Sequence, residues 1–121
     1  MLVADDDDDI LLLVTTRLKR DGYEVVSARD GVEALALARE HKPRVAVLDV
    51  GMPGLDGLEV LTAIRGAPEL GDTRVLLLTA KAQESDVRRG FDTGADAYVK
   101  KPFSPAELSE RVRELYDYDG G

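Results

Sequence analysis

The sequence contains no cysteine and only one histidine, and each scarcity removes a class of site. Without cysteine, the 121-residue chain forms neither a disulfide framework nor a thiolate metal site. The single histidine, His41, lies among Glu40, Lys42 and Pro43 at the end of a predicted helix. We expect a surface position for it rather than the position of a ligand.

Long hydrophobic runs are also missing. The longest unbroken apolar runs have five residues, as at residues 10–14, whereas a membrane span needs about 20. The N-terminus lacks the basic stretch followed by an apolar core that marks a secretory signal. We therefore expect no membrane segment and a cytoplasmic location.

Positive charge is in short supply, with 16 Lys and Arg against 24 Asp and Glu and a net charge of −8. This balance argues against a nucleic-acid surface, and no basic helix-turn-helix follows residue 116. It permits a bound cation, and five consecutive aspartates at residues 5–9 make that worth testing. Hydrophobic residues make up 44% of the chain, enough for the core of one compact domain.

Short β-rich runs alternate with longer stretches of helical period. The predicted strands are residues 2–4, 24–28, 44–48, 74–78 and 97–100, of which the second is mixed and is expected at an edge. Helix-start patterns lie between them, such as Asp30 with Glu33 and Ser104 with Glu107. Five repeats of strand then helix predict a doubly wound α/β fold with a parallel sheet.

Polar residues follow four of the five predicted strands: Asp5 and Asp6, Asp49, Thr79 and Lys101. Ligands bind at the carboxyl ends of the strands in such folds, so these side chains should meet in one crevice. Three carboxylates there repel each other unless a hard cation lies among them. Mg²⁺, with its preference for oxygen ligands, suits this set. Asp49 could then act as a nucleophile on a phosphoryl group.

A calcium loop is a weaker explanation of the aspartate run. Residues 5, 7 and 9 are all aspartate, but Ile10 takes the place of the required glycine and Thr16 that of the bidentate acid. For Asp8 and Asp9 we expect solvated positions in the first turn of a helix, where carboxylates oppose the helix dipole favourably.

Two other phosphate-handling folds place an aspartate after an apolar strand, as Asp49 is placed here. A P-loop nucleotidase is excluded because no glycine-rich loop ending in Gly-Lys-Ser or Gly-Lys-Thr exists in the chain. A haloacid-dehalogenase-type phosphatase expects a second acid two residues later, where this chain has Gly51. The phosphohydrolase alternative therefore lacks its proton donor.

Five segments resemble the signature stretches of chemotaxis-type bacterial response-regulator receiver domains. In chain order they are Leu2-Val-Ala-Asp-Asp-Asp, Val47-Leu-Asp-Val-Gly-Met-Pro-Gly-Leu-Asp-Gly, Leu78-Thr-Ala, Gly94-Ala-Asp-Ala-Tyr and Lys100-Lys-Pro-Phe. The resemblance covers essentially the whole chain. It implies one receiver domain over residues 1–121, with a core of about 2–116. It also implies a flavodoxin-like sheet of strand order 2-1-3-4-5 with five helices.

The resemblance also implies roles for particular residues. Asp49 would accept the phosphoryl group, and Mg²⁺ (or Mn²⁺ as a substitute) would be held by Asp5, Asp6, Asp49 and the backbone carbonyl of Gly51. Lys101 would pair with the phosphate. The resemblance further implies that Thr79 and Tyr98 form the switch and that Pro102 follows a cis peptide bond. Lys100, adjacent to Lys101, should point to the opposite face by strand alternation.

The partners implied are a sensor histidine kinase or phosphotransfer protein, a possible output domain, and a possible homodimer through helix 4, strand 5 and helix 5. The domain would be regulatory and catalyse only its own phosphorylation and dephosphorylation. A receiver-like docking module that is never phosphorylated is the third alternative, which the intact set of acids, threonine and lysine opposes.

Two departures from the common receiver pattern lead to hypotheses. Gly51 and Lys81 lie two residues past the phosphoacceptor and the threonine, flanking the path of the hydrolytic water, and the bare glycine predicts a phosphate lifetime that is not unusually long. Gly90 interrupts the fourth predicted helix, around Val87 and Phe91, at a cost of about 1 kcal/mol relative to alanine. We expect that helix to be mobile before phosphorylation.

Overall fold

The computed structural model describes residues 1–80, 88 and 91–117 and contains one five-stranded parallel sheet. The strand order is β2-β1-β3-β4-β5, which confirms the predicted order. The strands are β1 (Leu2–Ala4), β2 (Val26–Ala28), β3 (Val45–Asp49), β4 (Arg74–Thr79) and β5 (Ala97–Lys100).

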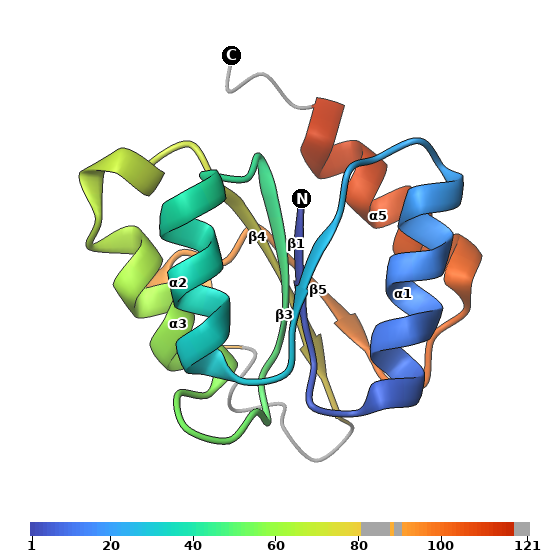
Figure 1. Ribbon diagram of the computed structural model, residues 1–121, viewed down its shortest axis with the longest axis horizontal. Coiled ribbons are helices and arrows are strands. Elements are labelled where there is room, and N and C mark those ends of the chain that lie inside the picture. The colour runs from blue at the N-terminus through green and yellow to red at the C-terminus, as the bar shows by residue number, and fades with distance from the viewer. Residues whose placement is uncertain (81–87, 89–90, 118–121) are drawn as a thin grey trace.

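Helices cover both faces of the sheet, as Figure 1 shows. One face carries α1 (Asp8–Arg20) and α5 (Pro105–Asp117), and the other carries α2 (Gly31–His41) and α3 (Gly57–Arg65), followed by a short 3₁₀ helix, η1 (Pro68–Leu70). In the fourth predicted helix, residues 88 and 91–93 are helical. Val87 and Gly90, on which the mobility hypothesis depends, lie outside the described residues.

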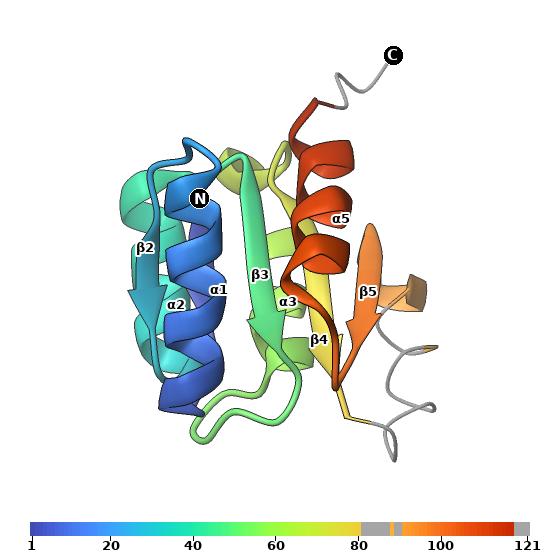
Figure 2. The same ribbon diagram turned by 90° about the vertical axis from the view of Figure 1, so that its right-hand side faces the viewer.

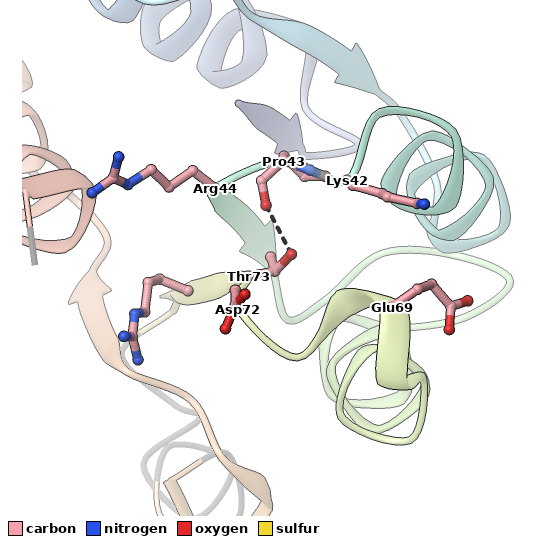
Figure 3. A pocket seen from close by; sticks show the side chains of 7 residues that line it. Lys42, Pro43, Arg44, Glu69, Asp72 and Thr73 are labelled. Carbon is pink, nitrogen blue, oxygen red and sulfur yellow. Dashed lines mark hydrogen bonds between the residues drawn. The ribbon is translucent and has the colours of Figure 1, made fainter. Parts of the chain in front are cut away.

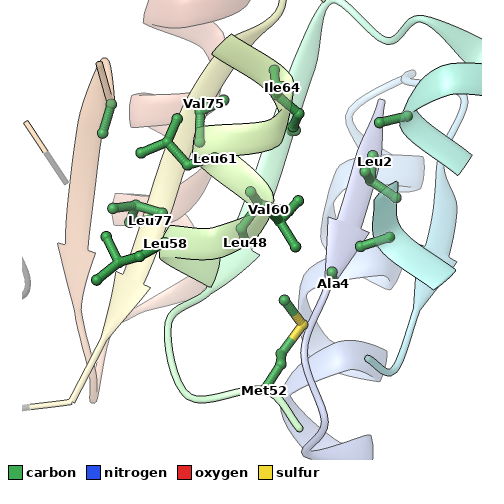
Figure 4. Close-up of a cluster of buried hydrophobic side chains, with 14 of the residues drawn as sticks. Leu2, Ala4, Leu48, Met52, Leu58, Val60, Leu61, Ile64, Val75 and Leu77 are labelled. Atoms are coloured by element: carbon green, nitrogen blue, oxygen red, sulfur yellow. The ribbon is translucent and has the colours of Figure 1, made fainter. Parts of the chain in front are cut away.

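The sheet divides the apolar core into two clusters. On the α2 and α3 side, Leu48 and Leu2 pack with Leu61 and Ile64 (Figure 4). The other cluster joins residues of β1, β3, β4 and β5 to the inner faces of α1 and α5. Because β1 and β3 are covered on both faces, every residue in them is buried, as is usual for central strands of a parallel sheet.

Two strands extend one residue further than predicted, through the polar residue at each strand end. Asp49 pairs in register with Leu78, and Thr79 pairs with Lys100, so the parallel ladder includes both polar residues. β2 is shorter than predicted and lies at one edge, where its mixed burial was expected. These pairings fix the backbone directly beneath the predicted site.

The helix starts follow short capping side chains. Asp30 accepts the Glu33 N–H at 2.8 Å and Ser104 accepts the Glu107 N–H at 3.1 Å, as the sequence predicted. A reciprocal capping box occurs at α3, between Asp56 and Glu59. Among the described residues, none of the helices combines the length and apolar character needed to cross a bilayer.

Candidate functional site

The carboxyl ends of the strands point to one end of the molecule, seen for β3, β4 and β5 in Figure 2. Because β1 and β3 are neighbours with Ala4 opposite Leu48, the residues that follow, Asp5 and Asp49, lie side by side. Carboxylate oxygens of Asp5, Asp6 and Asp49 come within 4.8 Å of one another. Asp5 and Asp49 are buried and Asp6 is exposed. The structure therefore brings together the three predicted acids.

The aspartates of residues 5–9 have different structural roles. The Asp5 carboxylate accepts the Asp7 N–H at 2.9 Å, which holds it at the end of β1. Asp7 is the N-cap of α1 and accepts the N–H groups of Asp9 and Ile10. Asp8 and Asp9 are exposed in the first helical turn, as predicted. The capping role of Asp7 was not predicted, although an aspartate before an apolar helical pattern is a typical N-cap.

Lys101 places its ammonium group between the two buried acids. Its Nζ lies 2.9 Å from Asp5 Oδ2 and 3.2 Å from Asp49 Oδ1. The Lys101 N–H donates to the Thr79 carbonyl at 2.7 Å, and the peptide bond between Lys101 and Pro102 is cis. Lys100 is exposed, so the two lysines differ as strand alternation predicted.

The electrostatics of the site disfavour charge on Asp49. Burial, together with the nearby Asp5 carboxylate, raises the pKa of Asp49 to about 6 against the pull of Lys101 and of the Gly51 N–H. Burial lowers the pKa of Lys101, but its hydrogen bond and charge interactions with Asp5 and Asp49 outweigh that, so this pKa lies above its ordinary value. Asp49 is thus an ionised but destabilised carboxylate at neutral pH.

The donor set fits a hard divalent cation. One carboxylate oxygen from each of three residues lies within 4.8 Å of the other two, and two of the three residues are buried. Mg²⁺ and Mn²⁺ accept such oxygen ligands, and Mg²⁺ keeps several waters, for which the exposed Asp6 side leaves access. Asp5, Asp6 and Asp49 are the residues that would hold it. The Gly51 carbonyl stays a predicted ligand.

The remaining predicted residues lie at the ends of β4 and within β5. Thr79 is fully buried, and its hydroxyl has no hydrogen-bond partner among the residues that the structure describes. Tyr98 is 42% exposed, and its ring meets that of Phe91 edge to face at 5.4 Å. The switch roles of Thr79 and Tyr98 stay predictions. Lys81 lies outside the described residues.

The opposite end of the sheet has a different character. A cavity of about 530 Å³ there is lined by Lys42, Pro43, Arg44, Glu69, Asp72, Thr73 and Arg74 (Figure 3). The Thr73 hydroxyl donates to the Pro43 carbonyl at 2.7 Å, which joins two of the lining residues. His41 is exposed at the end of α2, as predicted. This end holds none of the predicted site residues.

Comparison with known proteins gives the class. Residues 1–113 match the family model of the response regulator receiver domain. The chain is similar to the alkaline phosphatase synthesis transcriptional regulatory protein PhoP of Bacillus subtilis, with 44% identity over 95% of this chain and 47% of that protein. It has the same identity to the response regulator MprA of Mycobacterium sp. (strain KMS), over 95% of this chain and 49% of the relative.

Solved structures agree in fold. A putative response regulator from Chloroflexus aurantiacus superimposes with a TM-score of 0.90 at 36% identity, covering 97% of this chain and 96% of that one. The chemotaxis response regulator CheY4 of Vibrio cholerae gives 0.88 at 34%, covering 94% and 95%. The chain belongs to the response regulator receiver domain family. It spans about half the length of the curated relatives it matches.

Proposed function

We propose that this receiver domain switches by phosphorylation of Asp49, and that residues 1–121 form a single domain with a core of about 2–116. The observation that carries the proposal is the pair of buried carboxylates, Asp5 and Asp49, sharing the Lys101 ammonium at 2.9 and 3.2 Å. A structural ion pair needs one acid, so the second acid and the neighbouring Asp6 indicate a site for additional cationic charge.

The chemistry follows from these groups. A carboxylate oxygen of Asp49 forms a bond to phosphorus while the bond from phosphorus to the donor's leaving group breaks. A bound Mg²⁺ supplies positive charge that offsets the charge on the transferring oxygens. Lys101 is placed to leave the acids and pair with the phosphate. Thr79, whose buried hydroxyl lacks a partner among the described residues, could donate to a phosphate oxygen.

The donor would be a sensor histidine kinase or a phosphotransfer protein, and phosphorylation would shift the populations of two conformations. Dimerisation through helix 4, β5 and α5 stays a proposal. An output domain also belongs to this proposal, supported by the names of the relatives, which are regulators of about twice the length. A cytoplasmic location is part of the proposal as well. The domain would not bind nucleic acid itself, given its charge of −8.

Two other functions use the same residues. A phosphohydrolase would turn over a phosphodonor many times, but Gly51 occupies the position of its second acid. A docking module would never be phosphorylated. The proposal also holds that the chain is not an enzyme beyond its own phosphorylation and dephosphorylation.

Intact-mass measurement separates the three functions. With Mg²⁺ and acetyl phosphate, the wild-type protein should gain one phosphate, Asp49→Ala should gain none, and the matched surface variant Asp8→Ala should behave as wild type. Rapid multiple turnover of the donor would indicate the hydrolase. A wild-type protein without an adduct would indicate the docking module and overturn the proposal.

A further inference from the structure

Gly57, the first residue of α3, lies directly against the backbone of Asp49. A Cβ atom at position 57 would lie 2.4 Å from the Asp49 carbonyl oxygen and 2.9 Å from its carbonyl carbon. It would also lie 3.0 Å from the Val50 Cα. Real Cβ atoms do not come closer than about 3.0 Å, and all three neighbours are backbone atoms that no rotamer change can move away. Any side chain at position 57 must therefore displace either α3 or the peptide that follows Asp49.

The helix is held in place by its buried inner face. Leu58, Val60, Leu61 and Ile64 are all buried in the core cluster beside Leu48 (Figure 4). Shifting α3 would disturb close-packed contacts along its whole inner face.

Two hydrogen bonds set the peptide between Asp49 and α3. The Val50 N–H donates to the Leu78 carbonyl at 3.0 Å, and the Val50 carbonyl accepts the Gly57 N–H at 3.1 Å. Val50 is buried in the same core cluster as α3, whereas the next residue, Gly51, is exposed, so a displacement of this segment meets least resistance at Gly51. The displacement would thus fall on the residues that carry the acceptor carboxylate and the predicted carbonyl ligand.

We propose that Gly57 is a positioning residue: its missing side chain lets the first turn of α3 pack on the Asp49 peptide and fix Asp49 and Gly51 for metal binding and phosphoryl transfer. This inference rests on the function proposed above. Mg²⁺ demands near-octahedral ligand positions, and a misplacement of about 1 Å at a reacting group costs about 100-fold in rate.

The test compares two glycine-to-alanine variants that disturb the same loop. Gly57→Ala should raise the dissociation constant for Mn²⁺ and Mg²⁺ at least about tenfold and slow phosphorylation by acetyl phosphate at least about tenfold. Mn²⁺ binding is followed by electron paramagnetic resonance, with Mg²⁺ as competitor. The control is Gly31→Ala, whose Cβ would lie 1.8 Å from the Leu55 carbonyl oxygen, away from Asp49. It should lower thermal stability but change metal affinity less than about threefold.

A milder pair of variants covers the case in which Gly57→Ala does not fold. Asp56 caps α3 and Asp30 caps α2, each accepting an N–H at 2.8 Å, so removing either cap loosens one helix start without adding an atom. Asp56→Ala should weaken metal binding about threefold and Asp30→Ala should not. Asp56→Ser, which keeps a capping oxygen but not the charge, should restore wild-type affinity.

The outcomes separate this inference from the function beneath it. Equal metal affinities for folded Gly57→Ala and Gly31→Ala, or for the two cap variants, overturn the positioning role while the wild type still binds Mn²⁺ and accepts phosphate. A wild-type protein that does neither overturns the proposed function instead.

Discussion

Two polar clusters at opposite ends of the sheet differ in how completely their groups are paired. At the amino end, Arg65 donates to the carbonyls of Gly94 at 2.9 Å and Thr73 at 2.7 Å and pairs with Asp96 at 2.8 Å. Asp96 also accepts the Val75 N–H at 2.8 Å. At this end, donors and acceptors are matched across α3, β4 and the start of β5.

At the carboxyl end the polar groups are mismatched. Two buried carboxylates share the one ammonium of Lys101, and the buried Thr79 hydroxyl has no partner among the residues described. A buried hydroxyl without a hydrogen-bond partner lowers the stability of the fold by about 1–3 kcal/mol. Conflicts of this kind mark functional sites, whereas satisfied networks such as that of Arg65 stabilise the fold.

Removing the Lys101 ammonium should have the largest effect on the free energy of unfolding. Without Mg²⁺, Lys101→Met leaves two buried acids facing each other and should lower the free energy of unfolding by about 3 kcal/mol. On the proposed binding of Mg²⁺ to the three acids, saturating Mg²⁺ should recover most of this loss, because an ion bound to the folded state stabilises it. Urea unfolding with and without Mg²⁺ measures both, with Lys100→Met as the control. A loss that Mg²⁺ does not reduce would contradict the proposal that Asp5, Asp6 and Asp49 hold the ion.

Breaking the amino-end network should have a smaller effect that Mg²⁺ does not change. Arg65→Met removes hydrogen bonds to two carbonyls and to Asp96, and should lower the free energy of unfolding by about 2 kcal/mol. The exposed pair of Arg29 with Asp8 provides the control, since Arg29→Met should cost less than about 0.5 kcal/mol. Recovery of Arg65→Met by Mg²⁺ would erase the contrast between the two ends.

Neutralising Asp49, the proposed phosphoacceptor, should stabilise the fold, and only at higher pH. The pKa of Asp49 in the folded protein, about 6, lies above its ordinary value of 3.8, so the folded state holds the proton more tightly. Stability therefore falls as the pH rises from about 4 through 6, and the penalty is complete near pH 7.5. In metal-free buffer, Asp49→Asn should be more stable than wild type by about 1 kcal/mol at pH 7.5 and equal to it near pH 4.

Thermal unfolding at the two pH values measures this difference. A stabilisation of Asp49→Asn that is the same at both pH values would mean that its cause is not the ionisation of Asp49.

The smallest expected effect concerns the lifetime of the phosphate. Gly51→Asn adds a side chain beside the predicted path of the hydrolytic water and should lengthen the half-life of phosphorylated Asp49 about threefold, or about 0.7 kcal/mol in the barrier. The half-life is read from the decay of the phosphate adduct by intact mass after the donor is removed. Identical half-lives for the variant and the wild type would remove the hypothesis.

The fold and the site differ in how far the sequence alone predicts them. Wholly apolar runs identify the buried strands, and polar residues at strand ends identify Asp5, Asp49, Thr79 and Lys101, because both patterns are local. The capping box of Asp56 and Glu59 was equally readable, though it was missed. The contact of Gly57 with the Asp49 carbonyl could not be predicted from the sequence, because it depends on how closely α3 approaches β3.

The partners of Arg65 and the raised pKa of Asp49 also could not be predicted from the sequence, because both depend on how distant segments pack together. The three partners of Arg65, at Thr73, Gly94 and Asp96, come from segments up to 31 residues away in sequence. The raised pKa of Asp49 depends on the balance between burial, Asp5 and Lys101, which no residue pattern states. Spacing predicts which groups converge, and packing decides how strongly they act on one another.

The order of the strands along the chain has a consequence for how the protein folds. Asp5, Asp6 and Asp49 converge once β1 pairs with β3, which needs only the first 49 residues, whereas Lys101 follows the last strand. A chain folding from its N-terminus gathers the three negative charges before the ammonium that offsets them arrives. During synthesis, a divalent cation bound by these carboxylates would offset their repulsion before Lys101 is available, and would thereby favour the pairing of β1 with β3.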